Sequence, residues 1–72
     1  MSERLPALTA RQMISVLMRR GFALVRQSGS HAILRRLDGR RVTVPIHSGR
    51  DLGRGLTRKI MRDAELTMDD LK

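Results

Sequence analysis

Two histidines in this 72-residue chain stand where a side chain could carry a proton in a reaction. His31 follows a Gly29-Ser30 turn and begins an apolar run, whereas His47 comes directly after Pro45-Ile46. The ordinary pKa of histidine lies near neutrality, which suits the ring to the role of general base or general acid. His31 is therefore the first candidate for a catalytic residue, and His47 is a possible second histidine.

Arginine supplies a second kind of chemistry, the binding of phosphate. Thirteen of the fifteen basic residues are arginine, and with only seven acidic residues the net charge is +8. The guanidinium fork matches two phosphate oxygens, so this charge favours a polyanionic partner, most simply nucleic acid. The candidate phosphate-binding residues are Arg26, Ser30, Arg35, Arg36, Arg41, Arg54, Arg58 and Lys59.

Together these residues could hydrolyse RNA without a metal ion. A histidine can deprotonate the 2′-hydroxyl, which attacks the adjacent phosphate, while nearby arginines stabilise the charge that develops there. Ser30 has no acidic partner for a catalytic triad, so we interpret it as a turn residue that orients His31 or a phosphate. The alternative is that each histidine is an ordinary surface or structural residue.

The composition excludes several classes of protein and site. Cysteine is absent, which excludes disulfides, thiolate zinc sites, iron–sulfur clusters and a cysteine nucleophile, and we expect neither a metal nor another cofactor. No apolar run approaches the roughly 20 residues that span a bilayer, and the first residues lack an apolar signal core, so we expect a cytoplasmic protein without a membrane partner. Phe22 is the only aromatic residue, which disfavours a base-stacking platform.

Capping and periodicity predict two helices. Thr9 and Gln12 form a capping-box pattern, apolar residues follow at helical spacing, and Gly21 is a stop signal, so a helix is expected over residues 10–20. A glycine-rich loop over residues 47–55 could present backbone N–H groups to phosphate at the start of a second helix, expected over residues 56–64. Residues 67–70 could cap a last helical turn.

Between the helices the chain predicts three strands, over residues 22–27, 31–37 and 40–44. Asp38-Gly39 is a two-residue hairpin signal that would pair Leu37 with Arg40 and place His31 near residue 46. The two histidines would then lie near one edge of the sheet. The whole chain, residues 1–72, is expected to form one α+β domain, a helix–strand–strand–strand–helix arrangement like that of a double-stranded-RNA-binding domain. Both helices would cover one face of a three-stranded antiparallel sheet.

The chain resembles the HicA toxins, the small mRNA interferases of bacterial type II toxin–antitoxin modules. The resemblance runs from about residue 8 to residue 71. The matching pieces are RGF at 20–22, VRQSGSH at 25–31, DGRRVTVPIH at 38–47 and LGRGLTRKI at 52–60. Two positions depart from the family pattern: Thr57 replaces an aliphatic residue, and Glu65 stands where a glycine is expected to end the second helix.

This resemblance implies a fold, an activity and a partner. The fold would be the double-stranded-RNA-binding-like one, and the activity would be ribosome-independent mRNA cleavage with His31 as the catalytic residue. The partner would be a HicB-type antitoxin that covers the active site. Three other functions stay open on the residues alone: a non-catalytic basic RNA-binding module, a DNA-binding regulator, and a protein-interaction domain whose basic face meets an acidic partner.

Overall fold

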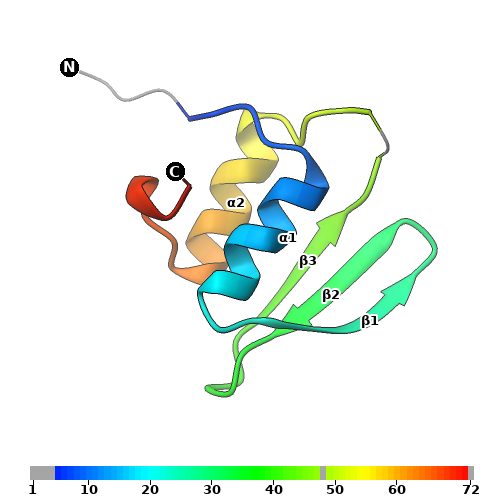
Figure 1. The fold of residues 1–72 in the computed structure, drawn as a ribbon, viewed down its shortest axis with the longest axis vertical. Helices are drawn as coiled ribbons and strands as arrows, with labels where there is room; N and C mark the ends of the chain where they lie inside the picture. Colours follow the sequence, from blue (N-terminus) through cyan, green and yellow to red (C-terminus); the bar gives the residue numbers. More distant parts are fainter. Residues whose placement is uncertain (1–4, 48, 72) are drawn as a thin grey trace.

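The computed structural model describes residues 5–47 and 49–71, which form three antiparallel strands and two α-helices in the predicted order. Helices α1 and α2 lie side by side on one side of a sheet whose strand order is β1-β2-β3 (Figure 1). The predicted α+β fold is confirmed. No helix among the described residues is long and apolar enough to cross a membrane. The elements are α1 (Ala10–Arg19), β1 (Ala23–Ser28), β2 (His31–Arg35), β3 (Arg41–Pro45), α2 (Arg54–Ala64) and a final 3-10 turn η1 (Met68–Leu71).

Helix α1 begins at the capping box that the sequence predicts. The Gln12 N–H donates to the Thr9 hydroxyl oxygen at 3.2 Å, and the Thr9 N–H donates to the Gln12 side-chain oxygen at 2.9 Å. The helix ends before Gly21, whose φ of +92° is a conformation that glycine adopts without steric cost. These two signals lie within the sequence of the helix itself, which is why its predicted bounds are close to the observed ones.

Helix α2 begins at Arg54, two residues before its predicted start at residue 56, and Gly53 is its N-cap. Thr57 is buried, and its hydroxyl donates to the Gly53 carbonyl at 2.6 Å, so the polar atom at this apolar position has a partner. At the other end, Glu65 adopts a left-handed conformation with φ of +56°, where a glycine was expected. Its carboxylate pairs with Arg36 at 3.5 Å and with Arg40 at 3.2 Å, which favours glutamate over glycine at this position.

The register of the β2–β3 hairpin differs by one residue from the predicted one. Arg36, not Leu37, pairs with Arg40, because the Arg36 N–H donates to the Arg40 carbonyl at 2.9 Å. The loop is therefore three residues long, and Gly39 takes the positive φ of +93° that such a loop requires. As a result, β2 ends at Arg35 rather than at residue 37, and His31 lies opposite Pro45 rather than residue 46.

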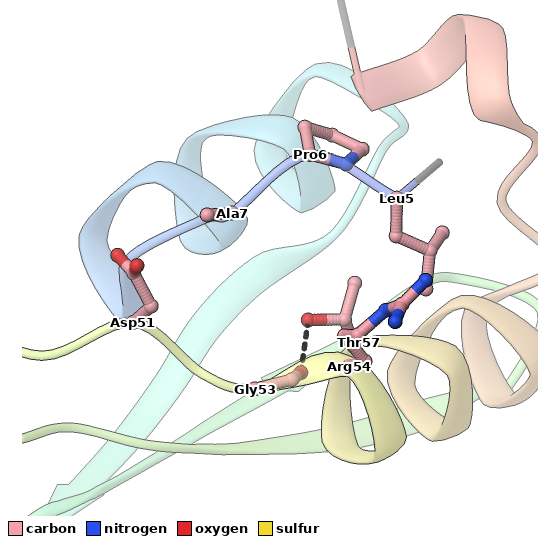
Figure 2. Close-up of a pocket in the computed structure, with 7 residues that line it drawn as sticks. All are labelled: Leu5, Pro6, Ala7, Asp51, Gly53, Arg54 and Thr57. Carbon is pink, nitrogen blue, oxygen red and sulfur yellow. Dashed lines mark hydrogen bonds between the residues drawn. The ribbon is translucent and has the colours of Figure 1, made fainter. Parts of the chain in front are cut away.

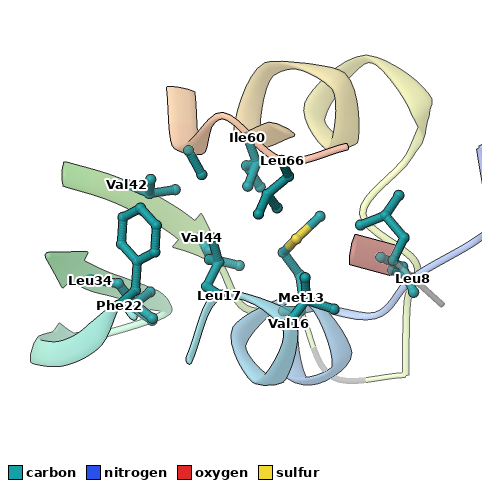
Figure 3. Close-up of a cluster of buried hydrophobic side chains, with 14 residues drawn as sticks. Leu8, Met13, Val16, Leu17, Phe22, Leu34, Val42, Val44, Ile60 and Leu66 are labelled. Carbon is teal, nitrogen blue, oxygen red and sulfur yellow. The ribbon is translucent and has the colours of Figure 1, made fainter. Parts of the chain in front are cut away.

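The hydrophobic core lies between the helices and one face of the sheet (Figure 3). Strands β2 and β3 contribute alternate residues to it, whereas β1 is exposed along its whole length. No helix of the described residues packs against the other face of the sheet (Figure 1). The largest fully buried side chains are Met13, Leu17, Leu34, Ile60, Val44 and Thr57.

A cluster of charged groups fastens the β2–β3 loop to the end of α2. The Arg36 guanidinium lies 2.7 Å from the Asp38 carboxylate and 5.1 Å from the centre of the Phe22 ring. Arg40 donates to the Asp63 carbonyl at 2.9 Å, in addition to its ion pair with Glu65. The hydrogen bond from Arg36, followed by the one from the Arg40 N–H, lowers the pKa of Asp38 to about 2.

We expect this cluster to make stability depend on pH in the acid range. The pKa of Asp38 falls from its ordinary 3.8 to about 2 on folding, so protonation favours the unfolded chain. The contribution of Asp38 is complete above about pH 5 and is lost as the pH falls through about 2. Asp38→Asn keeps an oxygen that can accept from the Arg40 N–H but has no charge. Its Tm should be lower than that of the wild type near neutrality, and the difference should shrink as the pH approaches 2. A difference in Tm that stays constant across this range would contradict the role given to Asp38.

Candidate functional site

The face of the sheet that the helices leave uncovered, here called the open face, carries three rows of side chains across the strands. Residues that lie opposite each other in an antiparallel pair point to the same face, and alternate residues along a strand point to opposite faces. Because Ala32 and Leu34 are buried on the helix side, their neighbours along β2 lie on the open face. The rows are Ser28–His31–Pro45, Arg26–Ile33–Thr43 and Ala23–Arg35–Arg41.

His31 is the first residue of the central strand and is exposed on this face. The Ile46 N–H donates to the Ser30 carbonyl, which continues the β2–β3 ladder by one more pair. His47 follows directly and is also exposed, so the structure brings both histidines to the same end of the sheet. No hydrogen bond joins either ring to another described residue, which leaves the ring nitrogens accessible to a substrate.

Three of the predicted phosphate-binding arginines share the open face with His31. Arg26 is one row from the histidine, and Arg35 and Arg41 stand opposite each other two rows away, which corresponds to about 7 and about 13 Å along the strands. All three side chains are exposed, and within residues 5–47 and 49–71 none of them pairs with an acidic group. The sequences of the three strands contain no aspartate or glutamate.

The other predicted phosphate-binding residues lie elsewhere. Arg36 points to the helix side of the sheet, where the charged cluster and Phe22 hold it. Arg54, Arg58 and Lys59 are exposed on α2, which packs against the opposite face, and Lys59 pairs with Asp63 at 2.8 Å. Ser30 lies in the turn beside His31. The structure therefore divides the candidate residues between the open face, the turn next to it, and the helix layer.

A β-bulge in β1 is a feature of the open face that the sequence pattern does not reveal. Leu24 pairs with Leu34, and Arg26 pairs with Ile33, so Val25 is an extra residue without a partner across the ladder. Bulges re-aim side chains and often lie beside functional sites. Here the bulge brings Val25 to the surface, where it is 53% exposed, next to an arginine of the open face.

A hollow of about 570 Å³ is separate from this face (Figure 2). It lies between the segment from Leu5 to Ala7 and the start of α2, and none of its lining residues belongs to a strand. Arg54 is the one predicted phosphate-binding residue that lines it. Among the described residues there is also no group of three or more histidine and carboxylate side chains that could hold a metal ion.

Comparison with known proteins gives one family. The model of the HicA toxin of bacterial toxin–antitoxin modules matches residues 10–66, which include α1, all three strands and α2. The match therefore contains the open face together with both histidines. No curated protein matches the chain.

We expect the open face to give the larger electrostatic contribution to phosphate binding. For single strands, each phosphate contact contributes about −0.7 to the slope of log K against log salt concentration. The variant Arg35→Gln/Arg41→Gln should therefore reduce the steepness of this slope by about 1.4 for a single-stranded DNA oligonucleotide, which cannot be cut through a 2′-hydroxyl.

The matched control is Arg54→Gln/Arg58→Gln, which removes the same charge from α2. Its slope should stay close to that of the wild type. An equal reduction in both variants would show that net charge, rather than the open face, determines binding.

Proposed function

The chain belongs to the HicA family of toxins of bacterial toxin–antitoxin modules, and from this premise we propose that it is an endoribonuclease that cleaves mRNA independently of the ribosome in the cytoplasm. The observation that carries the proposal is the composition of the open face. His31, a group suited to proton transfer, lies there with three arginines that no acidic side chain of the described residues neutralises. An accessible base that shares its face with unpaired cations fits a substrate that brings its own negative charge.

His31 acts as the general base in the proposed reaction. Its neutral imidazole takes the proton of the 2′-hydroxyl, and the oxygen forms a bond to the adjacent phosphorus while the bond to the 5′ oxygen breaks. The leaving 5′ oxygen takes a proton from an imidazolium. His47 is the candidate for that acid because the chain places it at the same end of the sheet. The products are a 2′,3′-cyclic phosphate and a free 5′-hydroxyl.

The arginines bind and stabilise the phosphates of the strand. Arg26 is in the row next to His31, which suits it to hold the non-bridging oxygens of the scissile phosphate as their charge develops. Arg35 and Arg41 lie one row further from His31 than Arg26 does, where they can bind a neighbouring phosphate of the same strand. Ser30 can orient His31 or donate its hydroxyl to the same phosphate. Because the nucleophile belongs to the substrate itself, the reaction needs no metal-activated water.

A toxin of this family has an antitoxin partner, and we propose that the partner is of the HicB type. The open face offers it a basic surface, and acidic side chains of the antitoxin can occupy the places of the RNA phosphates. Such a partner would neutralise the toxin by covering His31. A non-catalytic RNA-binding module would share the fold and the charge, and the experiment below separates that function from cleavage.

We expect the purified protein to cut RNA in the presence of EDTA and His31→Ala to lose this activity by a factor of at least about 100, as for other general acid–base residues. The measurement is the integrity of a transcript over time, with the product ends identified chemically. Gln27→Ala is the matched control, because Gln27 is an exposed polar residue opposite Ala32 on the other face of the sheet. It should cut at the wild-type rate.

His47→Ala tests the second histidine. If His47 is the acid, this variant cuts slowly and loses the alkaline limb of the pH–rate profile. Cleavage by His31→Ala at the wild-type rate contradicts the catalytic assignment. Salt-sensitive RNA binding with no cleavage by any of the proteins identifies a binding module instead.

A further inference from the structure

A shallow hollow lies at the end of the sheet away from His31, beside the row of Ala23, Arg35 and Arg41. Its volume is about 310 Å³, and it lies where the start of β1 meets the end of β2. Its floor is mostly aliphatic, and guanidinium groups border it. The lining residues are Gly21, Ala23, Val25, Arg35, Arg36 and Leu37.

Two of these residues expose apolar surface that the fold does not need. Leu37 is fully exposed at the tip of the β2–β3 loop, where the turn itself depends on Asp38 and Gly39. Val25 is the extra residue of the bulge and pairs with nothing across the ladder. Neither side chain belongs to the core. Exposed aliphatic groups that cluster around a hollow are typical of a binding surface.

The charges around the hollow indicate what binds there. Arg35 lines it, and Arg41 stands opposite Arg35 in the same row, while the strands carry no acidic residue. Within the described residues, Arg35 and Arg41 have no acidic partner. An aliphatic floor beside unpaired guanidinium groups complements a nucleoside whose phosphate is negative. The third lining cation, Arg36, is already held by Asp38 and Glu65, so it forms part of the wall.

The distance from His31 fits one continuous strand. The row of Arg35 and Arg41 lies about 13 Å from the row of His31, a length that about two to four nucleotides span, depending on how far the bases are stacked. A strand bound at the histidine can therefore reach the hollow across the open face without leaving the protein surface.

We propose that this hollow is a distal subsite that receives one nucleoside of the RNA substrate, a few nucleotides from the scissile phosphate, with Arg35 and Arg41 holding the adjoining phosphate. The inference rests on the proposed ribonuclease function and extends it. The proposal implies that kcat/KM is higher for RNA substrates long enough to reach both His31 and the hollow.

The test compares two RNA substrates with the same mapped cleavage site, a dinucleotide and an oligonucleotide of about ten nucleotides. In the wild type the longer substrate should have a kcat/KM about tenfold higher, the scale expected for burial of one or two aliphatic groups. In Val25→Thr/Leu37→Ser this ratio should fall severalfold, and the part that remains reflects the phosphate contacts of Arg35 and Arg41, which the variant keeps. Both residues are exposed and outside the core, and the Tm of the variant checks that it is folded.

The matched control is Met18→Ser, which removes an exposed apolar side chain from α1 without touching the hollow. It should keep the wild-type ratio. The subsite proposal is overturned if the kcat/KM ratio of the longer substrate to the dinucleotide stays about ten in Val25→Thr/Leu37→Ser. It is also overturned if this ratio is near one in the wild type.

A second measurement separates failure of the subsite from failure of the proposed function. If no protein cuts RNA, the affinity of each variant for the longer oligonucleotide is measured on the His31→Ala background by fluorescence anisotropy. A loss of about tenfold confined to the Val25→Thr/Leu37→Ser protein supports the subsite. Unchanged affinity overturns the subsite proposal and favours a protein partner for this apolar surface.

Discussion

The burial of Ala32, Leu34, Val42 and Val44 against the helices is the interaction on which the rest of the structure depends. Side chains alternate along a strand, so fixing these four on the helix side fixes the orientation of every neighbour. His31 and the arginines of the open face point outwards as a direct consequence. Both described helices lie on the opposite side of the sheet, so this face is open to binding in the described structure. The same alternation of side chains along the strands therefore places the core residues on one face and the candidate site residues on the other.

Arginine has two distinct roles in this fold, and the difference comes from the neighbouring groups. Arg36 and Arg40 reach acidic groups at the end of α2 and the ring of Phe22, so they fasten a hairpin to a helix. Arg35 and Arg41 are their immediate neighbours in sequence, yet they point the other way and meet no acidic group among the described residues. The acidic residues at the end of α2 thus neutralise the arginines of the helix side and leave the charge of the open face intact.

The sequence predicts the order of the elements and the bounds of α1, because the signals for these features are local. The faces of β2 stay ambiguous in the sequence, since apolar residues stand at both alternating sets of positions. The register of the hairpin is not local. Asp38-Gly39 is compatible with both a two-residue and a three-residue hairpin loop. In the observed three-residue loop, Arg36 and Arg40 form ion pairs with Glu65, which is distant in the sequence. The same contacts distinguish Arg36 from Arg35, which sequence reasoning placed together as phosphate-binding residues. The bulge at Val25 has no local signal at all, since the segment reads as a regular strand.

The acidic C-terminal segment has a consequence for how a partner arrives. Residues 63–72 carry a net charge of −3, and residues 4–62 carry +12. The ion pair between Arg20 and Asp70 anchors η1 beside α1, in the layer away from the open face. The acidic groups therefore offset part of the positive charge on the helix side, whereas the three strands carry no acidic residue. A polyanion that approaches the open sheet meets arginines whose charge is not offset within the strands, and this attraction raises the rate of encounter there. Added salt shortens the range of the attraction and slows encounter, even where the bound complex is unchanged.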